Sequence, residues 1–355
     1  MKLLHDYSLS ELKNQLEQLI QKMPRYRAQQ IFTWLYDYAE IDEMTNLPQE
    51  LRTLLKSEYI ANPVKIEREL VSKDGTKKYL LSLPDGNVVE AVLMSYKYGN
   101  TICISTQVGC RMGCAFCATG IDGLVRNLTA GEMLCEVLAV NKANGGTKAD
   151  RKITNIVLMG CGEPLDNYDN VVKFIKLISD KDGFNLSQRN ISLSTCGLSE
   201  KIKKLADEDL GITLTISLHA STDEERKKIM NVAKAVSLKE LFYAIKYYFD
   251  KTKRRIVFEY ILLDLNTSED DAVRLKQLCK NISCHFNLIP LNATPNTISE
   301  NKYLTPPTKQ KSAEFWEKLK QLGLSATTRR TLGEDINGAC GQLRRSVIKD
   351  KENKL

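Results

Sequence analysis

Three cysteines occur within one short stretch of this chain with the spacing C-x3-C-x2-C: Cys110, Cys114 and Cys117. They follow an apolar run over residues 101–108. A tetrahedral zinc site needs four ligands, and no fourth cysteine or histidine lies in the same loop. A [4Fe-4S] cluster also commonly takes four thiolates, so three local thiolates would leave one iron open to a small molecule. The spacing favours such a cluster, while a zinc knuckle and three unrelated loop cysteines stay open as alternatives.

The composition is that of an ordinary globular protein. The chain has 355 residues, 43% of them hydrophobic and 27% charged, and a net charge of +7. No apolar run approaches the ~20 residues that cross a bilayer, and the N-terminus is polar where a signal peptide would continue its apolar core. We therefore expect a cytoplasmic protein, in which ten cysteines indicate metal ligation or catalysis rather than disulfides. The mild positive charge is compatible with a nucleic-acid partner but does not identify one.

The first hundred residues contain a part with helical patterns followed by a part with β-strand patterns. Residues 8–60 have the apolar spacing of helices, with one helix after Ser8, a second over 27–38 and a third after Pro48. Residues 64–98 instead hold three β-rich runs, separated by the turn signals Asp74-Gly75 and Pro84-Asp85-Gly86. These patterns predict a compact helical module followed by a small antiparallel β meander.

From residue 100 onward, apolar β-branched runs alternate with helical patterns such as 170–179, 238–249 and 269–280. The predicted strands are 101–106, 153–159, 191–194, 212–218, 256–263 and 285–291, with 324–329 as a candidate seventh. Repeated β–α alternation implies parallel strands with right-handed crossovers, and six or seven units predict an α/β fold built as an open (β/α) partial barrel. We expect a helical accessory domain over 1–62, the β meander extension over 63–98, the barrel with a C-terminal catalytic segment over 99–345, and a charged tail over 346–355.

Polar residues gather where the predicted strands end, which is where parallel barrels carry their functional groups. Glu163 can accept a hydrogen bond from an ammonium group, and Ser194, Ser217 and Asn292 can bond a carboxylate or a ribose. Taken singly, each serine is more often a helix cap, and His219 is more often a packed histidine than a catalyst. Their joint placement on one rim, beside the three-cysteine loop, favours a binding site.

Cys340 lies after the last predicted strand, between the small residues Ala339 and Gly341, so little would shield its sulfur. Arg329 or Arg330 would help to lower its pKa if either is near in space. From these residues alone, a buried structural cysteine remains the alternative.

Six motifs in this order resemble the bacterial radical S-adenosylmethionine (SAM) RNA methyltransferases that modify carbon atoms of adenine, the RlmN/Cfr-like family. The resemblance covers nearly the whole chain. The motifs are Gln107-x-Gly-Cys110-x3-Cys114-x2-Cys117-Ala-Thr-Gly120, Asn127-Leu-Thr, Gly162-Glu163-Pro164-Leu165, Ser217-Leu-His-Ala220, Leu288-Ile-Pro-x-Asn292, and Arg329-Arg330-x2-Gly-x-Asp335-Ile-x2-Ala-Cys340-Gly-Gln-Leu343.

The resemblance implies a radical SAM partial barrel and assigns roles within it. One [4Fe-4S] cluster would be held by Cys110, Cys114 and Cys117. SAM would be bound by seven residues, namely Gly162, Glu163, Ser194, Ser217, Leu218, His219 and Asn292. Cys340 would carry the methyl group, Cys103 would be the resolving thiol, and Glu90 would accept a proton from the adenine ring.

The implied mechanism uses two SAM molecules per turnover, because the adenine carbon is not nucleophilic and a direct methyl transfer should fail. One SAM would methylate Cys340, and a second would yield a 5′-deoxyadenosyl radical that removes hydrogen from the S-methyl group. The resulting carbon radical would add to the adenine. Cys103 would then attack the sulfur of Cys340, forming a disulfide and releasing the product.

The motif Gly162-Glu163-Pro164-Leu165 resembles the branch that methylates C2, whereas the C8-methylating branch tends to carry Ala in place of that Pro. The implied substrate is adenine 2503 of 23S ribosomal RNA, with adenine 37 of some transfer RNAs as a further one. The alternatives are a C8 methyltransferase of the same family that confers ribosomal antibiotic resistance, and a non-catalytic Fe–S or zinc RNA-binding protein. The target base would leave its stack, while the helical module and the meander hold folded RNA by its shape and phosphates.

As partners we expect RNA and a reduced flavodoxin- or ferredoxin-type electron donor, no membrane, and a monomeric enzyme. The chain departs from the family pattern at a few positions. Cys161 stands where Met is usual, Asn231 and Ala233 stand where Pro and Asn are usual, and Gly338 replaces a common Ala. These departures bear on specificity more than on chemistry.

Overall fold

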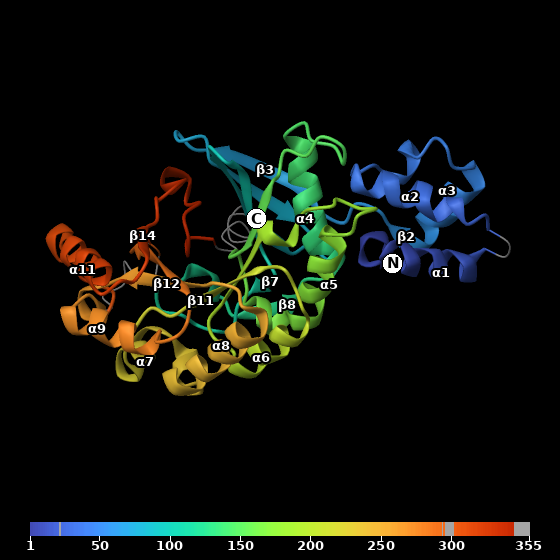
Figure 1. Cartoon of the computed structure of the whole chain (residues 1–355). Coiled ribbons are helices and arrows are strands. Elements are labelled where there is room, and N and C mark those ends of the chain that lie inside the picture. The colour runs from blue at the N-terminus through green and yellow to red at the C-terminus, as the bar shows by residue number, and fades with distance from the viewer. Residues whose placement is uncertain (21–22, 293, 295–301, 344–355) are drawn as a thin grey trace.

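The computed structural model describes residues 1–20, 23–292, 294 and 302–343. Its main feature is a ten-stranded sheet with the strand order β14-β13-β12-β11-β10-β9-β6-β5-β4-β3 (Figure 1). From β6 to β14 all neighbouring strands are parallel. The parallel strands are β6 (Gly99–Ile104), β9 (Asn155–Leu158), β10 (Ile191–Thr195), β11 (Thr213–Ser217), β12 (Ile256–Leu262), β13 (Cys284–Pro290) and β14 (Ala326–Thr328). The predicted open α/β partial barrel is confirmed, including its seventh strand.

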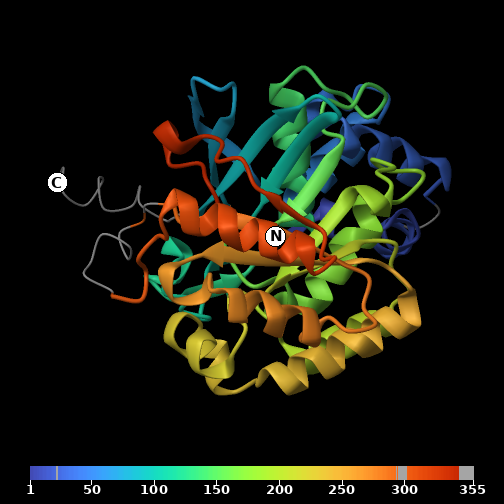
Figure 2. The ribbon, with the colours of Figure 1, turned by 60° about the vertical axis from the view of Figure 1, so that its left-hand side comes forward.

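Helices connect these strands and cover the outer face of the sheet (Figure 1). They are α4 (Ala130–Ala143), α5 (Tyr168–Ile178), α6 (Ser199–Asp207), α7 (Asp223–Ile229), α8 (Leu238–Thr252), α9 (Glu269–Leu278) and α11 (Lys309–Gln321). Three begin with a capping box, in which a Ser or Thr side chain and an acidic side chain pair with each other's backbone amides. Figure 2 shows α11 at the β14 end of the sheet, where it packs beside α9.

The meander belongs to the same sheet as the barrel. Strands β3 (Lys65–Val71), β4 (Lys77–Ser82) and β5 (Val88–Tyr96) are antiparallel, and β5 pairs in turn with β6. One face of the meander packs into the core through Tyr79, Leu81 and Ala91. Because side chains alternate along a strand, the opposite face presents Leu80 beside Glu90. This second face continues toward Cys103 of β6.

The N-terminal module contains α1 (Leu9–Leu19), α2 (Tyr26–Tyr36) and α3 (Gln49–Glu58), as predicted, and lies beside α4 (Figure 1). Helix α4 is buried over residues 130–141 because it lies between the sheet and this module. A short parallel pair, β1 (Lys2–Leu3) with β2 (Tyr59–Ile60), was not predicted. The domain boundaries at 62/63 and 98/99 stay predictions, and the sheet crosses the second without a break.

A small two-stranded ribbon, also not predicted, flanks the cysteine loop in the sequence. Strand β7 (Gln107–Gly109) pairs antiparallel with β8 (Leu124–Asn127), so the residues between them form a closed loop above the end of β6. Within the described ranges, none of the helices combines the length and the apolar character that a membrane span requires.

Candidate active site

The cysteine loop is closed by backbone contacts at its base and side. Gly109 has a φ of +77°, and a Cβ there would lie 2.0 Å from the carbonyl oxygen of Gly123, so only glycine fits. The amide of Cys110 donates to the same Gly123 oxygen at 3.0 Å. Further along, the side-chain amide of Asn231 donates to the Gly113 carbonyl at 3.1 Å. The unusual Asn231 therefore contacts the loop that carries the thiols.

The three loop thiols border one cavity at the C-terminal ends of the parallel strands. Burial raises the pKa of Cys110 to about 12 and that of Cys114 well above its ordinary value, so both would be protonated without a metal partner. Among the described residues, no three His, Cys, Asp or Glu side chains converge closely enough to hold a single metal ion. Three thiols on one cavity match the donor set of a cluster that keeps one iron open, whereas a structural zinc ion takes four protein ligands.

Most of the predicted SAM-binding residues border the same cavity. The residues that line it include Gly162, Glu163, Ser194, Ser217, His219, Asn292 and Cys340. Neither serine is a helix cap, because the N-cap of α6 is Leu198 and that of α7 is Thr222. Leu218 differs from the others, since its side chain is fully buried in the hydrophobic core. Leu218 is not among the residues that line the cavity, and its backbone N–H donates to the Glu259 carbonyl at 3.1 Å.

Glu163 is a buried carboxylate that two backbone amides hold in place. Its Oε1 accepts from Leu165 N at 3.0 Å and its Oε2 from Cys196 N at 2.8 Å. Burial raises the pKa of Glu163, and these amides oppose the shift. The side chains of Thr195 and Cys196 also hydrogen-bond to this carboxylate, which borders the cavity, so its charge could attract a cation there.

His219 is a neutral, well-packed histidine. Burial, followed by the positive charge of Arg226, lowers its pKa to about 3. Its Nδ1 accepts from the Ile261 amide at 3.0 Å, and its ring meets Phe116 of the cysteine loop edge-on with centroids 4.7 Å apart. The imidazole therefore supports the loop and keeps only Nε2 for a ligand.

The C-terminal segment brings Cys340 to this cavity. The side-chain amide of Asn292 donates to the Cys340 carbonyl at 2.9 Å, and the amide of Ala118 donates to the Gly341 carbonyl at 2.8 Å. Burial raises the pKa of Cys340 to about 11, and the positive charge of Arg329 opposes that shift. Cys340 also borders an adjoining hollow together with Cys103, whose pKa burial raises further. Both cysteines are free thiols in this structure.

Glu90 lies in a third, smaller hollow beside Cys161 and the base of the cysteine loop. It is 3% exposed and forms an ion pair of 2.7 Å with Lys78 of β4. Cys161 is also buried, which raises the pKa of its thiol to about 12. Among the other departures from the family pattern, Ala233 is buried. A Cβ at Gly338 would lie 3.3 Å from the Gly333 carbonyl oxygen, which is a close contact.

Sequence reasoning gave no role to two residues of the site, Glu259 and Gln107. Glu259 of β12 lines the cavity and forms an ion pair of 3.1 Å with Arg329, the residue beside Cys340. A single acidic residue within an apolar predicted strand was the available signal for Glu259. Gln107 links the ribbon to the rim, because its Oε1 accepts from Glu163 N at 2.9 Å. Nothing in the local sequence indicated that partner.

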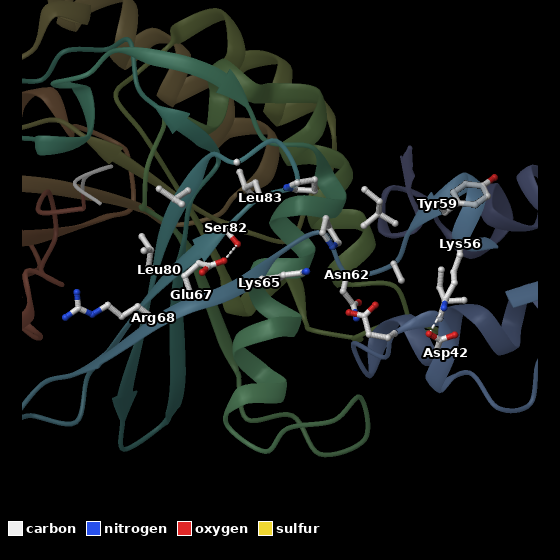
Figure 3. A pocket seen from close by; sticks show the side chains of 18 residues that line it. Asp42, Lys56, Tyr59, Asn62, Lys65, Glu67, Arg68, Leu80, Ser82 and Leu83 are labelled. Atoms are coloured by element: carbon white, nitrogen blue, oxygen red, sulfur yellow. Dashed lines mark hydrogen bonds and ion pairs between the residues drawn. The ribbon is translucent and has the colours of Figure 1, made fainter. Parts of the chain in front are cut away.

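A larger hollow of about 1240 Å³ lies elsewhere, between the helical module and the meander. Figure 3 shows Lys56 and Tyr59 on the module side and Lys65, Arg68 and Leu80 on the meander side. No cysteine lines it. This groove therefore lacks the thiol chemistry of the cavity described above.

Comparisons with known proteins agree with this geometry. The Radical SAM superfamily model matches residues 104–279, and the model of the ribosomal RNA large subunit methyltransferase N-terminal domain matches residues 3–60. A Clostridium perfringens protein named "Probable dual-specificity RNA methyltransferase RlmN" is 49% identical over the full length of both chains. A protein of the same name from Clostridium novyi is 47% identical over 99% of this chain and 100% of its own.

A solved structure is also similar over nearly the whole chain. It is a radical SAM methyltransferase from Sphaerobacter thermophilus, with a TM-score of 0.91, 40% identity, and coverage of 98% of this chain and 100% of that one. The full-length similarity and both domain matches agree with the thiol-lined cavity of the partial barrel. The chain belongs to the RlmN family of radical SAM RNA methyltransferases.

Proposed function

We propose that this enzyme methylates C2 of adenine 2503 in 23S ribosomal RNA and of adenine 37 in some transfer RNAs, through an S-methylcysteine on Cys340. The observation that supports this most is that one cavity is bordered both by the three loop cysteines and by Cys340. A module that only binds RNA would need no free thiol opposite a thiol triad. The relatives' name, dual-specificity RNA methyltransferase, supports two kinds of RNA substrate.

In this proposal Cys110, Cys114 and Cys117 hold the [4Fe-4S] cluster. When bound, the cluster and SAM supply a 5′-deoxyadenosyl radical, with two SAM molecules used per turnover. The chain's own groups bind and orient SAM. The carboxylate of Glu163 would accept from its ammonium group, because that carboxylate is buried and fixed by two amides. Ser194, Ser217 and Asn292, together with Gly162 and His219, complete the rim. Leu218 does not line the cavity, so it would contribute through its backbone alone.

The two remaining thiols would complete the reaction. Cys340 takes the methyl group, and Cys103, which borders the adjoining hollow, later attacks the sulfur of Cys340 to form a disulfide and release the RNA. Arg329 is positioned to favour both thiolates, because its charge lowers the pKa of each against the effect of burial. Glu90 accepts the proton that leaves the adenine carbon. We also propose a reduced flavodoxin- or ferredoxin-type electron donor and a monomeric enzyme.

The groove of Figure 3 is where we propose that folded RNA rests. Arg68, Leu80 and Glu90 lie in register on one face of the meander, so the groove leads along that face toward Glu90. Lys65 and Arg68 are exposed, and neither forms an ion pair within the described part of the chain. The buried Oδ1 of Asn62 borders the groove and has no hydrogen-bond partner among the described residues, so it could accept from a base or ribose.

Changing Lys65 and Arg68 together to alanine should raise the Kd for a folded RNA substrate by about tenfold at moderate salt. The physical reason is that two phosphate contacts and their counterion release would be lost. Filter binding at several salt concentrations would measure the change, and the salt slope should fall by about two. Lys239→Ala on α8, an equally exposed lysine of the outer layer, is the matched control. Equal Kd values for the double variant and this control would exclude the groove as the RNA site.

The proposed activity is tested by nucleoside mass spectrometry of RNA from a bacterial host that lacks its own adenine-C2 methyltransferase, with and without this gene. We expect new 2-methyladenosine in ribosomal RNA and in some transfer RNAs. The motif with Pro164 favours C2 over C8, so 8-methyladenosine in its place would overturn the assignment of the carbon. If neither appeared while soluble, cluster-containing protein was present, the proposed substrate would be wrong.

A further inference from the structure

Lys78 is a buried lysine whose ammonium group lies between two parts of the active site. It is 8% exposed, and its Nζ is 2.7 Å from Oε1 of Glu90. The same Nζ donates to the backbone carbonyl of Asn337 at 3.1 Å. Asn337 precedes Cys340 by three residues. One side chain thus contacts both the proposed proton acceptor and the segment that carries the proposed methyl carrier.

The same segment is also tied to the β3–β4 hairpin by two aspartates that do not contact Glu90. Oδ1 of Asp335 accepts from the Ser72 hydroxyl at 2.5 Å, and its Oδ2 accepts from the Lys73 amide at 3.2 Å. In the reverse direction, Asp74 accepts from the Gly333 amide at 2.9 Å. These bonds tie the segment to the hairpin, whereas the bond from Lys78 is the one that also joins it to Glu90.

A buried lysine–glutamate pair is weak evidence for stability, because the desolvation of two charges offsets much of their attraction. Apolar side chains of similar volume would pack this part of the meander as well. Glu90 of this pair borders the hollow at the base of the cysteine loop, so the pair lies where it can act on the reaction. The position of Lys78, between Glu90 and Asn337, indicates which chemistry that would be.

We propose that Lys78 is a positioning residue that keeps Glu90 ionised and joins it to the Cys340 segment, so that proton removal from the RNA adduct is coupled to release of the product. The proposal rests on the proposed function of Glu90 and Cys340. In the proton step, the C–H bond of the radical adduct breaks, its electron pair re-forms the aromatic system of the adenine, and the proton goes to a Glu90 oxygen. The remaining unpaired electron would pass to a one-electron acceptor, for which the oxidised iron–sulfur cluster is the candidate. Glu90 is then neutral, and its ion pair with Lys78 ends. Lys78 then keeps only the Asn337 carbonyl as a partner, so this bond strengthens and shifts the segment into position for attack by the Cys103 thiolate on the sulfur of Cys340. The S–S bond forms as the S–CH2 bond breaks, its electron pair goes to the methylene carbon, and that carbon takes a proton from solvent to become the methyl group.

The test uses the cluster-loaded enzyme with SAM and an RNA hairpin that contains the target adenine. Lys78→Met removes the charge at similar volume, and Lys78→Arg keeps it. Asp335→Asn is the matched control, because it loosens the same segment without touching Glu90. Three quantities are followed: methylation of Cys340 by intact-protein mass spectrometry without RNA, the covalent protein–RNA adduct on denaturing gels, and the methylated RNA released.

For Lys78→Met we expect Cys340 methylation to be kept, the adduct to accumulate, and release of methylated RNA to slow by about tenfold to a hundredfold. This is less than the roughly 10²–10⁴-fold that loss of the general base itself would cost, because Glu90 stays in place. Lys78→Arg should restore most of the release. Asp335→Asn should slow adduct formation and release in equal proportion, without accumulation. If Lys78→Met released methylated RNA at the parental rate, the proposal would be overturned. It would also be overturned if Lys78→Met, like Asp335→Asn, slowed adduct formation and release in equal proportion. If Lys78→Met does not fold, Lys78→Gln takes its place.

A second measurement separates this inference from the proposed function. Hydrogen exchange of residues 329–343 in the cluster-free protein should be several times faster in Lys78→Met than in the parent, because the bond to the Asn337 carbonyl is lost. If the parent methylated no RNA, the proposed function would fail on its own. Unchanged exchange in Lys78→Met would overturn the link between Lys78 and the segment, whatever the RNA assay shows.

Discussion

Replacing Cys340 with alanine is expected to abolish RNA methylation while leaving the iron–sulfur cluster in place. Cys340 borders the cavity of the three loop cysteines but comes from a segment more than 200 residues later in the chain, so its loss should not disturb the cluster ligands. The rate should fall by at least about a thousandfold, since removing a covalent nucleophile commonly costs more than that. Methylated nucleosides would be measured by mass spectrometry, and the cluster by its iron content and visible absorbance.

The matched comparison is Cys114→Ala, which should lose both the cluster and the activity. Serine at position 340 is a stricter variant, because its hydroxyl is nearly isosteric with the thiol but is a poor methyl acceptor. Retained methylation in either Cys340 variant would exclude the carrier-cysteine mechanism. A Cys114→Ala protein with unchanged iron content and absorbance would refute the assignment of that residue as a cluster ligand.

The repeating part of the fold could be predicted from the sequence because its signals are local. Each barrel strand is a short apolar run, and each following helix has an apolar stripe, as in α5 with Val171, Phe174 and Ile178 buried. The β7–β8 ribbon had no such signal. Its strands are only three and four residues long, and their pairing depends on the closed cysteine loop between them. The parallel pair of β1 and β2 was missed for the same reason, since two residues show no periodicity.

The site could be predicted where a residue's position along its own strand decides its location. Ser194 and Ser217 lie at the C-terminal ends of β10 and β11, Asn292 follows β13, and parallel strands bring all such ends to one rim. Lys78 could not be found in this way, because its partner Asn337 is 259 residues distant and the contact needs the C-terminal segment to fold back onto the meander. The pair of Glu259 and Arg329 is likewise a contact between segments 70 residues apart.

Arg226 illustrates a residue whose importance only the structure reveals, since the sequence shows it as one cation in a charged helix. Its side chain is fully buried, and within the described chain it has no carboxylate in ion-pair contact. Instead its Nη2 donates to the Cys196 carbonyl at 2.6 Å and its Nε to the Leu218 carbonyl at 3.2 Å. These carbonyls lie just past the ends of β10 and β11, the two strands that carry Ser194 and Ser217.

Arg226→Met should therefore destabilise the protein by about 3 kcal/mol. Two buried carbonyls would lose their donors, at about 1–3 kcal/mol each, and relief of the buried charge would offset part of that loss. For a chain of this length the apparent Tm should fall by roughly 4 °C. Anaerobic thermal denaturation would measure it, with Lys227→Met, the exposed neighbour on α7, as a control that should not shift. Arg226→Lys keeps the charge but not the planar guanidinium group with its several N–H donors, so it should recover only part of the lost stability. If Arg226→Lys were as stable as the parent, the positive charge rather than the hydrogen bonds to the two carbonyls would hold the strand ends together. If Arg226→Met were as stable as the parent, neither the charge nor those hydrogen bonds would matter.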